Sequence, residues 1–150
     1  MASIVLKNFV TTNGQVWLSI PDEQRGQIKQ ALFSMLACPD EKRLKSVCTA
    51  VAAFAAIEVP AKKWPEFLQT MFGAQSSDQH KFAALLCIEY FASFLDTIGA
   101  QIESTEVDQI LGATVHNMSC PDPRISKMAV KALNYVLPHA ALNFAQPDQR

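Results

Sequence analysis

The sequence lacks several features that would point to common classes of protein. Glycine is scarce, with five copies in 150 residues, and no glycine-rich strand-to-helix loop is present to cradle a phosphate. The formal net charge of −1 gives no overall field to attract nucleic acid or an acidic membrane surface. No apolar run reaches the roughly 18 residues that a membrane-spanning helix needs, and the first residues show no cleavable leader. We therefore expect a soluble intracellular protein with no nucleic-acid partner and no membrane insertion.

Patterns of catalytic and metal-binding residues are also missing. The four cysteines are too scattered for a zinc knuckle or a redox motif. Two of them, Cys48 and Cys87, lie in apolar runs where a thiol usually acts as a small core hydrophobe. The three histidines are His80, His116 and His139. None of them has a matching nucleophile or a second ligand at the spacing that a metal site needs. These observations predict no enzymatic activity, no cofactor and no metal.

Signals for β-strands are absent, and alanine is abundant, so the chain is predicted to be nearly all helix. Apolar residues recur at helical spacing in five segments, 21–37, 41–58, 78–97, 105–118 and 122–137, and a short helix begins around residue 64. Ser19 suits the cap of the first segment, and Pro138 is expected to close the last. The segment 78–97 is apolar nearly all round, which predicts a helix in the middle of a stack. Its expected solvent-exposed line is Lys81, Glu89, Ser93 and Asp96.

The predicted helices recur as pairs about every 40 residues, which is the period of HEAT repeats. We therefore predict an all-α superhelix, a solenoid of HEAT or armadillo type, as one fragment of a longer stack. Its parts are a partial repeat over 1–20, repeats over about 21–58, 60–98 and 104–138, and the start of another over 139–150. In such a stack the first helix of each pair covers the outer surface and the second lines the inner one.

One segment carries a specific resemblance to a known family. IEVPAKKWPEFLQTMF, residues 57–72, resembles the importin beta signature in which one repeat ends in Ile-Glu-x-Pro and the next helix opens with Trp-Pro-Glu. Other segments agree with it: ASIVLKNFVTT, WLSI, LLCIEYFASFLD and KMAVKALNYVL. One departure is Glu89, where the family usually carries glycine beside the tyrosine that corresponds to Tyr90. The chain thus resembles the N-terminal HEAT repeats of importin beta, also called karyopherin beta.

The resemblance implies a role in nuclear import, with the inner helices binding the small GTPase Ran in its GTP form. Polar residues of the predicted second helices would form that site: Lys42, Lys45, Thr49, Lys81, Glu89, Arg124, Lys127, Lys131 and Asn134. A solvated polar face is the alternative for each of them. The resemblance also implies a location in the cytoplasm and nucleus and at the nuclear envelope and pore.

Other partners of the family are expected only through repeats largely missing here. These partners are Phe-Gly nucleoporins, cargo and importin alpha, and the nearest slot for a nucleoporin phenylalanine would lie beyond the fifth helix, near Phe144. Trp64 is interpreted as a packing wedge between repeats. The alternative function is a HEAT-repeat scaffold subunit of another multiprotein complex, which explains the periodicity equally well but not the Trp-Pro-Glu element.

Overall fold

The computed structural model describes Asn8, Thr12, residues 14–72 and residues 77–144. Regular structure in these ranges is helical throughout, which confirms the predicted all-α class. Its elements are α2 (Gly14–Ser19), α3 (Asp22–Ser34), the 3-10 turn η1 (Met35–Ala37), α4 (Glu41–Glu58), α5 (Phe67–Phe72), α6 (Asp78–Ile98), α7 (Ser104–Met118) and α8 (Pro123–Phe144). None of these helices has a stretch both long and apolar enough to cross a bilayer.

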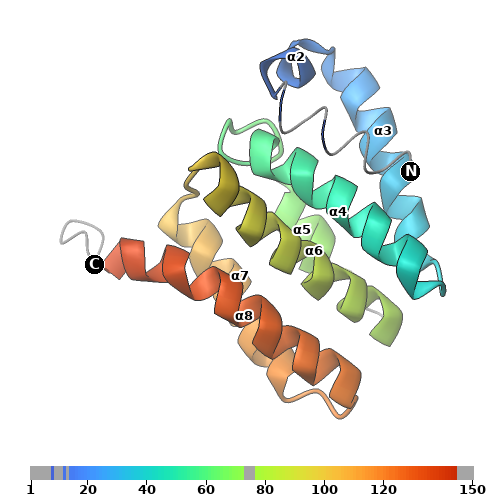
Figure 1. Ribbon diagram of the computed structural model, residues 1–150, viewed down its shortest axis with the longest axis vertical. Coiled ribbons are helices and arrows are strands. Elements are labelled where there is room, and N and C mark those ends of the chain that lie inside the picture. Colours follow the sequence, from blue (N-terminus) through green and yellow to red (C-terminus); the bar gives the residue numbers. More distant parts are fainter. Residues whose placement is uncertain (1–7, 9–11, 13, 73–76, 145–150) are drawn as a thin grey trace.

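The helices stack as hairpins in two layers. In Figure 1 the helices α4, α6 and α8 lie side by side in one row, with α5 and α7 behind them and α3 against α4. Helix α6 packs on both α4 and α8, and α7 packs on α8. We call α4, α6 and α8 the inner row. The architecture is the predicted α-α superhelix, in which each hairpin buries its apolar sides against its neighbours.

Local capping interactions fix where the inner row begins and ends. The Asp40 carboxylate accepts hydrogen bonds from the backbone N–H of Lys42 at 3.0 Å and of Arg43 at 3.3 Å, so α4 starts at the predicted residue. The Ser77 hydroxyl oxygen accepts from the backbone N–H of His80 at 3.2 Å and caps α6. At the other end of α6, Gly99 has a φ of +68°, a left-handed conformation that stops the helix.

The start of the first repeat differs from its prediction. Ser19 does not cap α3; it ends α2, and its hydroxyl donates to the carbonyl oxygen of Val16 at 2.6 Å. Pro21 precedes α3 and has no N–H that needs a partner. Of the partial repeat predicted over 1–20, residues 1–7, 9–11 and 13 lie outside the described residues, as do residues 145–150 at the other end.

The end of the last helix was also predicted wrongly. Pro138 does not close α8, which runs on to Phe144, so residues 139–144 belong to this helix rather than to the start of another repeat. Proline removes one backbone hydrogen bond from a helix interior, at a cost of about 3 kcal/mol or more. Burial offsets that cost here, because His139 and Ala140 directly after the proline are 7% and 4% exposed.

The middle of α4 and the middle of α6 form the centre of the core. Residues 50–56 of α4 and 82–89 of α6 are buried, and many of them are alanine, which lets the two helices approach closely. Cys48 and Cys87 are fully buried, as predicted, and the Cys48 thiol lies 3.6 Å from the carbonyl oxygen of Ala83. Both thiols therefore lie in the buried middle of α4 and α6.

A buried ion cluster joins α2, α3 and α4. Glu58 at the end of α4 is fully buried, and it accepts hydrogen bonds from Trp17 Nε1 at 3.1 Å, from the Arg25 guanidinium at 2.7 Å and from Lys29 Nζ at 2.7 Å. Arg25 also pairs with Asp22. We call Trp17, Arg25, Lys29 and Glu58 the Glu58 cluster. It gives a physical role to the glutamate of the Ile-Glu-x-Pro element, because that carboxylate is the anion on which three donors converge.

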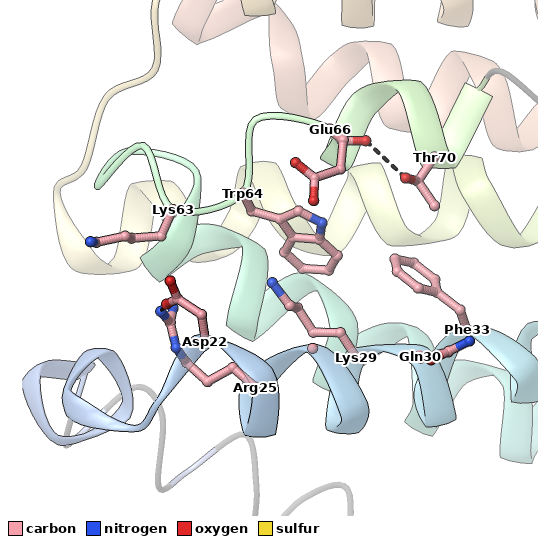
Figure 2. A pocket seen from close by; sticks show the side chains of 10 residues that line it. Asp22, Arg25, Lys29, Gln30, Phe33, Lys63, Trp64, Glu66 and Thr70 are labelled. Atoms are coloured by element: carbon pink, nitrogen blue, oxygen red, sulfur yellow. Dashed lines mark hydrogen bonds and ion pairs between the residues drawn. The ribbon is translucent and has the colours of Figure 1, made fainter.

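Trp64 of the Trp-Pro-Glu element lies next to the Glu58 cluster, where it contacts Lys29. Its ring is 4% exposed and lies 5.5 Å from the ring of Phe33 and 4.9 Å from that of Phe67, between centroids. Lys29 reaches over the ring, as Figure 2 shows, and its Nζ lies 4.2 Å from the ring centroid. The predicted packing wedge is confirmed, although the helix begins at Phe67 rather than at Trp64.

Candidate binding groove

A hollow of about 290 Å³ opens on the inner row. We call it the inner groove, and its lining comes from all three helices: Glu41 and Lys45 from α4, Phe82, Leu86 and Tyr90 from α6, and Arg124, Lys127, Met128 and Lys131 from α8. Residues three or four apart on a helix share a face. The spacing within each set therefore turns these side chains toward the same space.

The rim of the inner groove is basic. Four of its lining residues carry a positive charge, and Glu41 is the one acid among them. The chain as a whole has a formal net charge of −1, so the positive charge is a local feature of this surface. Charges of one sign around a concave surface concentrate the field there. The groove is consequently suited to an anionic partner.

The cations of the rim are held to different degrees. Lys45 Nζ lies 3.3 Å from Glu41 Oε1, in an exposed pair one turn apart that contributes little to stability. The Arg124 guanidinium carbon lies 4.1 Å from the centroid of the Phe82 ring, in a cation–π contact. Within the described ranges the side chain of Lys127 has neither a hydrogen bond nor an ion pair. Its charge is therefore available to a partner.

Lys131 is anchored to a buried acid. Its Nζ lies 3.3 Å from Glu89 Oε1, while the whole Glu89 residue is 5% exposed. The other carboxylate oxygen of Glu89 has no hydrogen-bond partner among the described residues. The expectation that Glu89 faces water is wrong, because α8 covers this side of α6 and brings Lys131 over the carboxylate.

Three contacts of this kind follow the seam between α6 and α8. Arg124 meets Phe82, Lys131 meets Glu89, and His139 Nε2 lies 3.1 Å from Asp96 Oδ1 without hydrogen-bond geometry. On α6 the contacting residues are seven positions apart. Each contact pairs a basic side chain of α8 with an aromatic ring or a carboxylate of α6, so the seam fixes the register of the two helices.

Tyr90 forms the polar part of the groove floor. Burial raises the pKa of Tyr90 above its ordinary value of 10.0, and the negative charge of Glu89 adds to the rise. The phenol therefore stays neutral at physiological pH and can donate a hydrogen bond. The rest of the floor is apolar, since Phe82, Leu86 and Met128 are largely buried.

The structure gathers some of the predicted site residues and leaves others apart. Lys45, Arg124, Lys127 and Lys131 line the inner groove. The remaining candidates do not line it: Lys42, Thr49, Lys81, Glu89 and Asn134. Thr49 donates its hydroxyl to the carbonyl oxygen of Lys45 at 2.7 Å, and Lys81 lies 3.8 Å from Asp78. Lys42 and Asn134 are exposed.

Sequence reasoning missed the apolar floor of the groove. The residues Phe82, Leu86 and Tyr90 recur every fourth position, but α6 is apolar nearly all round, so no face stands out in the sequence. Their role emerges only when α4 and α8 are placed on either side. The missed members of the lining are Glu41, Phe82, Leu86, Tyr90 and Met128.

Two further hollows lie on the side of the first helices. One of about 450 Å³, drawn in Figure 2, lies beside Trp64, but Arg25 and Lys29 on its wall already bind Glu58. The other, of about 540 Å³, lies between α5 and α7 and is lined by Leu68, Gln69, Phe72, Asp108, Gln109, Gly112 and Ala113. The nucleoporin slot predicted near Phe144 falls at a side chain outside the described part. The first hollow has one cation that is not bound to Glu58, Lys63, and the second is lined by a single charged residue, Asp108, so neither gathers several such cations, as the inner groove does.

Comparison with known proteins places the chain in a family. Residues 39–145 match the family model described as IPO5-like, TPR repeats. The chain is 24% identical over 159 residues to Importin subunit beta-1 of Schizosaccharomyces pombe, covering 99% of this chain and 18% of the relative. It is 26% identical over 162 residues to Importin subunit beta-1 of Arabidopsis thaliana, covering 100% of this chain and 18% of the relative.

A third relative, Importin subunit beta-1 of Saccharomyces cerevisiae, is 27% identical over 108 residues, covering 64% of this chain and 12% of the relative. The chain thus spans less than a fifth of the length of these relatives. No solved structure gives a match. The family model and the three relatives agree with the two-helix repeats, and the chain belongs to the importin beta family.

Proposed function

We propose that this chain is the partner-binding part of a nuclear transport receptor, and that its inner groove binds Ran in the GTP form. The observation that carries the proposal is the groove itself, where four cations from α4 and α8 surround an apolar floor. Membership of the importin beta family supports the choice of partner. The role is binding rather than catalysis, and it needs no cofactor.

In this role the chain acts in the cytoplasm and the nucleus, during import of protein cargo through the pore. A stack in which each hairpin contacts only its neighbours bends by many small rotations. A partner that binds one curvature better than another shifts the stack toward that curvature. Binding of Ran-GTP would thereby lower the affinity for cargo in the complete receptor.

Binding of immobilised Ran, loaded with GTP or with GDP, tests the proposal. We expect the GTP form to bind this chain more tightly, and the double charge reversal Lys45→Glu, Lys127→Glu, at two exposed cations of the groove, to weaken that binding about tenfold or more. The matched control is Lys63→Glu, an exposed cation that lines the hollow beside Trp64. Circular dichroism should show equal helicity for all variants. Binding that ignores the nucleotide would favour the scaffold alternative, and an unaffected double variant would show that another face is used.

A further inference from the structure

The inner groove combines two chemistries that a single partner segment would have to match. Its floor contains Phe82, Leu86 and Met128, which are 6%, 3% and 7% exposed. The volume of about 290 Å³ lies at the lower limit of small-molecule pockets, which is roughly 300 Å³. The hollow is open and shallow, so it suits one large apolar side chain inserted from a neighbouring surface.

The cations of α8 follow the groove in a line. Arg124, Lys127 and Lys131 are separated by three and four positions and therefore share one face of the helix. With a rise of 1.5 Å per residue, the line is about 10 Å long. Carboxylates on successive turns of a helix, or on alternate residues of an extended segment, have similar spacings. The line of cations therefore matches a short run of acidic side chains.

A nucleic acid fits these observations less well than an acidic protein segment. The positive surface is short and the chain carries a net charge of −1, whereas phosphate backbones are held by extended basic faces. The ring of Phe82, which would have to stack on a base, lies beneath Arg124 and is 6% exposed. A protein segment with one apolar side chain between carboxylates would contact both the apolar floor and the cations of the groove.

We propose that the inner groove takes an acidic segment of a partner protein, which inserts one large apolar side chain against Leu86 and Met128 while its carboxylates bind Arg124 and Lys127. The inference deepens the proposed function and rests on the inner groove being the binding face. Glu89, buried below the groove, reduces the attraction of the site for an acidic segment. It holds Lys131 through one oxygen, and its negative charge opposes that of an incoming carboxylate.

Fluorescence anisotropy with short labelled peptides tests this chemistry. The first peptide carries a central leucine between glutamates, the second has alanine in place of the leucine, and the third has lysines in place of the glutamates. We expect binding of the first peptide only, with an affinity that falls as salt is added. Equal binding of the lysine peptide, or of a single-stranded oligonucleotide of the same length, would overturn the proposal.

Variants of the chain locate the contact. Lys127→Glu should weaken binding of the leucine peptide about tenfold, which is about 1.4 kcal/mol, and Arg124→Glu should do the same. Glu89→Gln should instead tighten binding about two- to threefold, since it removes a buried negative charge below the groove. Lys63→Glu, outside the groove, should leave the affinity unchanged. Equal affinities for all four variants would overturn the proposal.

Comparison with Ran separates the two ideas. If the leucine peptide binds and responds to these variants while Ran-GTP does not bind, the groove chemistry stands and the proposed partner is wrong. If Ran-GTP binds and the double variant weakens it, but the peptide does not bind, the proposed function stands and the acidic-segment inference fails.

Discussion

Removal of the charge of Glu58 should destabilise the chain more than any exposed charge change. The carboxylate is 0% exposed and accepts from Trp17, Arg25 and Lys29, of which the latter two have side chains only 3% and 13% exposed. In Glu58→Gln these two cations stay buried without their main anion. Removing one partner of a buried ion pair costs about 3–5 kcal/mol. Such a loss is between about a fifth and the whole of the free energy of unfolding of a typical domain, which is about 5–15 kcal/mol.

Urea unfolding followed by circular dichroism measures the effect. With a slope of about 2 kcal/mol per molar urea, the midpoint should fall by about 2 M while the slope stays constant. Glu41→Gln is the matched control, because Glu41 is half exposed and pairs with Lys45 on the surface. Its loss should be below about 1 kcal/mol.

A compensated variant separates charge from shape. Replacement of the whole charged set, in Glu58→Leu with Arg25→Met and Lys29→Met, removes the anion and both cations together. Stability should then recover part of the loss, because no uncompensated charge remains buried, whereas the buried Trp17 Nε1–H still loses its acceptor. The reasoning is refuted if Glu58→Gln stays within 1 kcal/mol of the unmodified chain, or if the triple variant is less stable than the single one.

Three further outcomes are expected. The pKa of Cys87 is raised well above 9.0 by its hydrogen bond with Cys48 and by burial, so mass spectrometry should find both thiols unalkylated by iodoacetamide until urea unfolds the chain; labelling in the native state would contradict this. The pKa of Tyr90 is raised in the folded state, so the contribution of the neutral phenol to stability is complete below the ordinary pKa of 10.0 and is lost as the pH rises through the pKa of the folded state. Tyr90→Phe should therefore reduce the fall of the urea midpoint at alkaline pH. An identical fall in the variant and the unmodified chain would contradict this reasoning. Gly99→Ala should lower the free energy of unfolding by about 1 kcal/mol, because φ at this position is +68°. Gly112→Ala, in open space within α7, should raise it by about 0.5–1 kcal/mol. Thermal melts that shift both variants in the same direction would be inconsistent with these conformations.

The sequence predicts the helices well because their signals are local. Apolar spacing is a pattern of nearby residues, so the start of α4 at Glu41 is predicted correctly, and the structure adds the Asp40 cap. Pro138 shows where local evidence fails. A proline usually ends a helix, and only the burial of the residues that follow it, which depends on the neighbouring helices, keeps α8 intact.

The candidate site was predictable only in part for the same reason. The cations of α8 stand out in the sequence as polar residues on an amphipathic helix, and three of them line the groove. Glu89 and Arg25 were not recognised as buried, because a charged residue is seldom buried unless a distant partner covers it. Those partners, Lys131 and Glu58, lie 42 and 33 positions away in the chain.

The matched contacts along the seam of α6 and α8 limit how the solenoid can change shape. A slip of α8 by one helical turn, about 5.4 Å, would separate Arg124 from Phe82 and Lys131 from Glu89 at the same moment. A pivot about the same line moves neither pair far. The contacts between α6 and α8 therefore permit rotation of adjacent hairpins about the line where the two helices meet. They oppose sliding of one helix along the other.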